Sequence, residues 1–235
     1  MDSINRSGAR SMWNLPAPPG FQGLREDLPL TVYVRHLPHW RQDGATYFVT
    51  FRLADSLPKA KLNELASLRR EWERLHPPPR KKESLERLAR DQAERIEIWL
   101  DVGMGSCLLK EQSSSALLNE AMHHFNNKHY ELGAYVVMPN RCHAILRPLA
   151  CTEHDLETIV GGWKQYSGKR INEHRGTKGE VWQDECYDRI IRDEEHLYRC
   201  LQYIGRNPTK AGLTRNECSL WISPEWAALG WKFEE

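Results

Sequence analysis

The feature that most constrains the fold is the order in which two hydrophobic periodicities follow one another. Residues 46–53 alternate strongly apolar and less apolar side chains, which is typical of a β-strand. Residues 113–125 instead repeat apolar positions at three- and four-residue steps, which predicts an amphipathic helix. The same reading predicts further strands at 132–138, at 141–147 and within 181–191, and further helices after 155 and from Asp193 to about Asn207.

This order of strand, helix, strand, strand, helix, strand and helix predicts an α+β fold. It fits a ferredoxin-like antiparallel sheet with helices on one side. Two more amphipathic stretches interrupt the order between about residues 58 and 100, with three prolines at 77–79 between them. They predict an inserted α-helical hairpin whose apolar faces bury each other, or which serves as a nucleic-acid clamp or a dimer contact.

The ends of the chain differ in composition from its middle. Residues 1–28 carry several prolines and few periodic apolar positions, so we expect a loose N-terminal arm. Residues 29–215 form the predicted domain, which includes the hairpin. Residues 216–235 are expected to be a C-terminal tail.

Charge and hydropathy limit the function classes. The net charge of +1 does not indicate a generally basic nucleic-acid binder, although residues 162–215 hold more Lys and Arg than Asp and Glu. No apolar run approaches the roughly 18 residues that span a bilayer, and no signal pattern opens the chain. We therefore expect a cytoplasmic protein without a membrane partner. The six cysteines form no CxxC pair, so we expect them to be small buried hydrophobes.

Four residues form a candidate site. Alternation along the strand places Arg141 and His143 on one face, and Tyr203 lies four residues before Asn207 on the last helix, so their side chains are neighbours. A tyrosine hydroxyl beside an amide oxygen, both directed at a strand that binds a metal ion, is a workable nucleophile site. The alternative is a structural histidine and a half-buried tyrosine bonded to solvent.

Several ordered motifs resemble one protein family. The segment AYVVMPNRCHAIL at 134–146 resembles the metal-site strand of the REP-associated tyrosine transposases, relatives of the single-tyrosine insertion-sequence transposases of the HUH nuclease class. The segments WKQY at 163–166, VWQDECYDRIIR at 181–192 and YIGRNPTKAG at 203–212 follow in the family's order. The resemblance covers about residues 37–215, and the hairpin indicates a larger-than-minimal branch.

The resemblance implies roles for three residues. Tyr203 matches the nucleophile, which attacks DNA, keeps a 5′-phosphotyrosine link and frees a 3′-hydroxyl. His143 matches the second histidine of the HUH pair, and Asn207 matches the third ligand of a Mg²⁺ or Mn²⁺ ion. The implied partner is single-stranded or hairpin DNA, handled by a monomer or a homodimer in DNA transposition or repeat-element mobility.

Arg141 departs from the family pattern, because it stands at the position of the first histidine. A guanidinium offers no lone pair to a metal ion. His196 lies too far along its helix to replace that histidine, while His123 and His124 remain open as substitutes. Either the protein is a catalytically impaired, domesticated DNA-hairpin-binding protein, or Arg141 neutralises the scissile phosphate directly. The candidate phosphate-binding residues are Arg141, Lys164, Arg199, Arg206 and Lys210.

Overall fold

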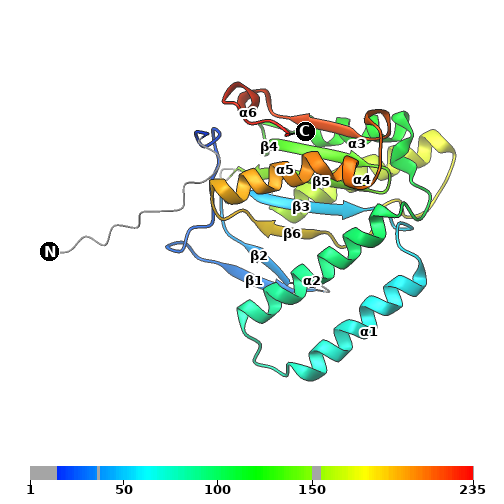
Figure 1. Ribbon diagram of the computed structural model, residues 1–235. Coiled ribbons are helices and arrows are strands. Elements are labelled where there is room, and N and C mark those ends of the chain that lie inside the picture. The colour runs from blue at the N-terminus through cyan, green and yellow to red at the C-terminus, as the bar shows by residue number, and fades with distance from the viewer. Residues whose placement is uncertain (1–14, 36–37, 150–154, 235) are drawn as a thin grey trace.

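The central sheet has five antiparallel strands in the order β6-β3-β5-β4-β7 (Figure 1). The computed structural model describes residues 15–35, 38–149 and 155–234. The five strands are β3 (Tyr47–Arg52), β4 (Tyr130–Met138), β5 (Arg141–Pro148), β6 (Tyr187–Ile190) and β7 (Ser219–Ile222).

Two helices connect these strands in the ferredoxin-like manner. The first, α3 (Gln112–His124), lies between β3 and β4 in the chain, and the second, α4 (Leu156–Arg175), lies between β5 and β6. The strand β5 pairs with both β3 and β4, and β6 pairs with the free edge of β3. This is the split βαβ arrangement, and the predicted α+β fold is confirmed.

Helices cover both faces of the sheet, which corrects the prediction that they lie on one side. On one face Val49 packs into a core with α3 and α4. On the other face Phe48 and Ile145 pack into a second core with α5 (Glu194–Lys210) and α6 (Pro224–Ala228). The strands carry apolar side chains on both faces, and leaving either one in water would cost about 25 cal/mol per Å². The face of the sheet that α3 and α4 leave uncovered therefore needs a helix, and α5 covers it.

The helix α5 also runs farther than the sequence predicts. It continues through Pro208 to Lys210 instead of ending near Asn207. The proline falls in the last turn, where the carbonyl groups of Asn207 and Pro208 accept bonds from Ala211 and Leu213 at 3.0 and 2.9 Å. These bonds close the helix end, so the cost of the proline stays local.

The predicted hairpin is present as α1 (Lys59–Leu75) and α2 (Lys82–Asp101). In Figure 1 α2 lies nearer the sheet and α1 lies farther out. No residue of α1 is buried, whereas α2 buries its three residues Leu88, Ala89 and Leu100. The hairpin is therefore attached mainly through α2 and does not form a closed core of its own.

A small two-stranded ribbon lies beside β6. It consists of β1 (Thr31–Val34) and β2 (Pro38–Arg41), which pair antiparallel. Short 3₁₀ helices occur at Leu108–Lys110 and Arg215–Glu217.

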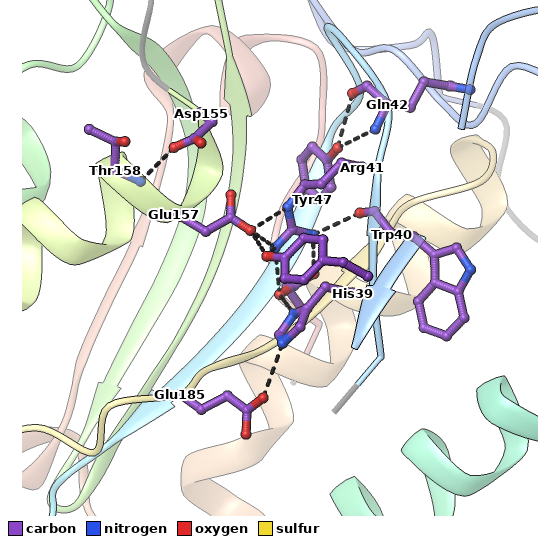
Figure 2. Close-up of polar contacts among 11 residues, drawn as sticks. His39, Trp40, Arg41, Gln42, Tyr47, Asp155, Glu157, Thr158 and Glu185 are labelled. Carbon is purple, nitrogen blue, oxygen red and sulfur yellow. Dashed lines mark hydrogen bonds and ion pairs between the residues drawn. The ribbon is translucent and has the colours of Figure 1, made fainter. Parts of the chain in front are cut away.

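Charged side chains attach the ribbon to the domain. We call His39, Arg41, Glu157, Glu185 and Asp188 the His39 cluster; His39 and Asp188 are buried and the other three are partly buried. Asp188 of β6 accepts hydrogen bonds from His39 Nδ1 at 2.6 Å and from Arg41 at 2.5 and 3.0 Å. His39 Nε2 lies 3.2 Å from Glu185, and Arg41 Nε donates to Glu157 at 2.7 Å. Figure 2 shows the side chains of His39, Arg41, Glu157 and Glu185 directed toward one another.

The described parts of the two predicted terminal segments contact the domain. Residues 1–14 of the predicted arm lie outside the described residues. The rest of it has no helix or strand, but Thr46 N donates to Gln22 O at 2.8 Å and Trp231 Nε1 to Pro16 O at 2.9 Å. The segment predicted as a tail instead supplies β7 and α6, because β7 completes the edge of β4. No helix among the described residues is long and apolar enough to cross a membrane.

Candidate functional site

The candidate site lies where β5 faces α5. Arg141 and His143 point to the α5 side of the sheet, while Cys142 belongs to the core on the other side, as alternation predicts. The helix brings Tyr203 and Asn207 to the same place. The rings of His143 and Tyr203 have centroids 5.3 Å apart, and Arg141 donates to Asn207 Oδ1 at 2.9 Å. All four residues predicted for the site therefore converge.

Arg141 is the centre of this site, and its side chain is buried. Its Nε donates to His143 Nε2 at 3.1 Å, and one terminal nitrogen donates to Asn140 Oδ1 at 3.2 Å. The other terminal nitrogen, besides Asn207, bonds Asp101, and Nε also lies 3.1 Å from Glu97 Oε2. We call Arg141, His143, Asn207, Glu97 and Asp101 the Arg141 cluster.

The two carboxylates of the cluster were missed by sequence reasoning. Glu97 and Asp101 lie four residues apart on α2, so they share a face of that helix. Their spacing is visible in the sequence, but nothing in the sequence says that this face meets β5. Lys210 of α5 adds a positive charge, with its Nζ 3.0 Å from Asp101 Oδ2. The inserted hairpin therefore contributes directly to the site.

His143 is neutral, and its tautomer follows from its partners. A guanidinium only donates, so His143 Nε2 must be the accepting nitrogen, and Nδ1 carries the proton and donates to Thr50 Oγ1 at 2.8 Å. Burial holds the pKa of His143 well below its usual value, and the Arg141 charge lowers it further. The ring also stacks on Phe48, with centroids 5.8 Å apart.

Tyr203 is half-buried beside the same histidine. Its ring meets Phe48 edge to face, with centroids 5.7 Å apart. Burial raises the pKa of the Tyr203 phenol, and the negative charge of the neighbouring Glu97 carboxylate raises it further. Burial likewise raises the pKa of Glu97, against the lowering effect of Arg141. The phenol is therefore held in its protonated form.

The residues of this site do not fit a divalent metal ion. The two predicted ligand atoms, His143 Nε2 and Asn207 Oδ1, both accept hydrogen bonds from Arg141, so their lone pairs are engaged by a fixed positive charge. Among the described residues, no group of three or more His, Cys, Asp and Glu side chains is placed to hold a metal. The upstream histidines do not help, because His123 and His124 lie on α3, which packs on the opposite face of the sheet, where His123 bonds Tyr135.

The other predicted phosphate-binding residues do not join the site, apart from Lys210. Arg199 and Arg206 lie on the exposed side of α5, where they pair with Glu195 and Glu234 at 2.9 and 3.1 Å. Lys164 belongs to α4, which covers the opposite face of the sheet, and donates to the carbonyl group of Asp184.

Comparison with known proteins yields one distant likeness. No family model and no curated protein matches the chain. A solved structure, described as a REP-associated tyrosine transposase bound to a REP hairpin, is 18% identical and aligns over 78% of this chain and 75% of that chain, with a TM-score of 0.37. A likeness this distant does not identify the family of the chain.

Proposed function

We propose that this chain is a transposase-like protein that binds single-stranded or hairpin DNA and has lost metal-dependent strand cleavage. Two observations support the transposase-like part: the ordered motifs of the sequence, and the convergence of Tyr203, His143 and Asn207 at one place. The observation that carries the loss of cleavage is that Arg141 occupies both predicted ligand atoms of the metal.

The electrostatics of the site support this proposal. A tyrosine attacks a phosphate as the phenolate, so a raised pKa leaves little nucleophile near neutral pH. In a metal-dependent site the ion would polarise the phosphate and stabilise the developing charge. Here the Arg141 charge is already balanced by Glu97 and Asp101. In the protein without DNA, the site therefore presents neither an unpaired arginine nor a deprotonated phenol to a phosphate.

One contact favours a second candidate function, which is strand transfer without a metal ion. The Glu97 carboxylate lies close enough to Tyr203 to perturb its pKa, so it would be positioned to take the phenol proton. The phenol oxygen would then bond to phosphorus, the bond from phosphorus to the 3′-oxygen would break, and the released 3′-oxygen would be protonated. Arg141 would take the place of the metal by holding a phosphate oxygen.

A cleavage assay separates the two candidates. Stem-loop DNA with single-stranded flanks is incubated with the wild type or with Tyr203→Phe, with Mn²⁺ or with a chelator, and covalent adducts are resolved on a denaturing gel. We expect DNA binding in a parallel gel-shift assay and no adduct in any lane. An adduct that survives chelation but is absent from Tyr203→Phe would establish the second candidate. An adduct that requires Mn²⁺ would contradict the loss of metal-dependent cleavage, and absence of DNA binding would overturn both candidates.

A further inference from the structure

We infer that Arg141 and Lys210 form a binding site for one DNA phosphate, and that Glu97 and Asp101 of the inserted hairpin occupy this site when DNA is absent. This inference rests on the proposed DNA binding. The α2 carboxylates and the phosphate would compete for the same two positively charged side chains. The position of the hairpin would therefore control access to the site.

The first argument is the chemistry of the partners. An arginine guanidinium and a phosphate pair through parallel N–H···O bonds, and a carboxylate makes the same kind of contact. Glu97 Oε2 lies 3.1 Å from Arg141 Nε, and Asp101 bridges Arg141 and Lys210. The two α2 carboxylates therefore present oxygens where a phosphate would present its own.

The second argument is that the Glu97 carboxylate is not fully hydrogen-bonded in this position. Arg141 Nε donates its proton to His143 Nε2, so Glu97 Oε2, although 3.1 Å from Nε, has no hydrogen-bond partner among the described residues. A buried acceptor left without a hydrogen bond destabilises the state in which it is buried. Closure by Glu97 is thus less favourable than a fully satisfied ion pair.

The third argument is the weak attachment of the hairpin. No residue of α1 is buried, and α2 buries only Leu88, Ala89 and Leu100 among its described residues. Elements with few buried apolar residues open at lower free energy than the core does. Movement of α2 away from β5 would uncover Arg141. The three buried α2 residues belong to neither core of the sheet, although the partly buried Leu85 packs against one of them.

The fourth argument is a cavity that reaches the site from beneath the hairpin. Its volume is about 490 Å³, and Glu97 and Thr50 form part of its wall. Arg52 also lines it and bonds a hydroxyl and a carbonyl group, those of Ser56 and Leu53. Burial lowers the pKa of Arg52 to about 10, so it is still charged at neutral pH. This cavity places the Arg52 charge on the same wall as Glu97, and its remaining lining is mostly apolar, with a second carboxylate from Glu185.

The test compares two pairs of substitutions on the same helix. Glu97→Gln with Asp101→Asn removes the competing charges, whereas Glu94→Gln with Asp91→Asn makes the same change in net charge at exposed positions. Affinity for fluorescein-labelled stem-loop DNA is measured by anisotropy. We expect the first pair to bind about tenfold more tightly than the control pair, the effect of one hydrogen bond to a charged group. Adding Arg141→Gln to the first pair should abolish the gain.

Each outcome decides a different claim. Equal gains in the two pairs would show a net-charge effect alone and overturn the competition, while the proposed DNA binding would stand. Absence of DNA binding by every protein would overturn the proposed function itself.

The pair Glu97→Gln with Asp101→Asn leaves the buried Arg141 without its charged partners, which can destabilise the fold. Hydrogen exchange of the wild type therefore provides a second test that needs no substitution. DNA binding should lower the protection of the α2 amides but not of the α3 and α4 amides. Unchanged or increased protection of α2 in the DNA complex would overturn the inference.

Discussion

The molecule contains two buried clusters of charge that use the same kinds of side chain with opposite results. In the His39 cluster burial alone would lower the pKa of His39, but the hydrogen bonds to Asp188 and Glu185 raise it to about 9. In the Arg141 cluster burial holds the pKa of His143 well below its usual value. The first histidine is charged and balanced, whereas the second is neutral beside a fixed cation.

The carboxylates show the same contrast. Burial would raise the pKa of Asp188, but hydrogen bonds from His39 and Arg41 lower it. The pKa of Glu97 is raised by burial, and the attraction of Arg141 does not overcome this effect. Buried groups whose pKa is shifted because their neighbours do not stabilise the charged form are typical of functional sites. Buried groups whose charge is compensated by their neighbours are typical of structural contacts. The comparison indicates that the His39 cluster is a structural contact and that the Arg141 cluster is a candidate functional site.

The largest expected effect is a loss of stability on substitution in the His39 cluster. Asp188→Asn removes the carboxylate that both His39 and Arg41 contact, and leaves these buried charges undercompensated. We expect a loss of about 3–5 kcal/mol in the free energy of unfolding at pH 7. Urea unfolding followed by tryptophan fluorescence measures it. The control Asp27→Asn alters an exposed pair with Arg25 and should leave the free energy of unfolding nearly unchanged. Similar effects of the two variants would contradict the comparison.

The second prediction is a pH dependence that originates in the His39 cluster. A pKa raised from 6.5 to about 9 in the folded state means that the folded protein binds the proton more tightly. The resulting stability, about 3 kcal/mol, is fully present below pH 6.5 and is lost as the pH rises through 9. Urea midpoints between pH 6 and 9.5 measure this loss. His39→Gln should flatten the profile, and an unchanged slope in that variant would assign the pH dependence to other groups.

The third prediction converts the Arg141 cluster into a metal site. Arg141→His frees the lone pairs of His143 and Asn207 and adds an imidazole on the same strand face. Mn²⁺ should then stabilise the variant against thermal unfolding, by about 2.7 kcal/mol at a hundredfold excess over Kd. The wild type and Arg141→Gln should show no such shift. If Mn²⁺ stabilises all three proteins alike, Arg141 does not block the site. Recovery of a Tyr203-linked DNA adduct in the variant would show that the rest of the machinery is intact.

The smallest effect is expected for the phenol. Tyr203→Phe removes the hydroxyl beside Glu97 but keeps the aromatic contacts with Phe48 and His143. We expect a change in stability of about 1 kcal/mol, the value of one hydrogen bond, and unchanged DNA affinity. A calorimetric scan and an anisotropy titration measure the two. A large loss of DNA affinity would mean that the hydroxyl contacts DNA in the complex.

Periodicity was sufficient for most of the fold. The alternation at 46–53 predicts the strand β3, and the prolines at 77–79 separate two helices where the structure has α1 and α2. The placement of α5 on the second face was not predicted, because an apolar strand shows that both faces are buried without showing what covers each. The positions of Glu97 and Asp101 were also missed, since their contact with Arg141 joins segments about forty residues apart in the chain.

The sequence by itself determined the α+β order, the helical hairpin and the sharing of one strand face by Arg141 and His143, because local spacing sets these. It also showed that Arg141 brings a positive charge to the predicted site. Only the tertiary structure decided what that charge does. Packing of α2 and α5 around β5 places two carboxylates, an imidazole and an amide on the guanidinium. The energy of a buried charge depends on all its neighbours at once, and these come from separate parts of the chain.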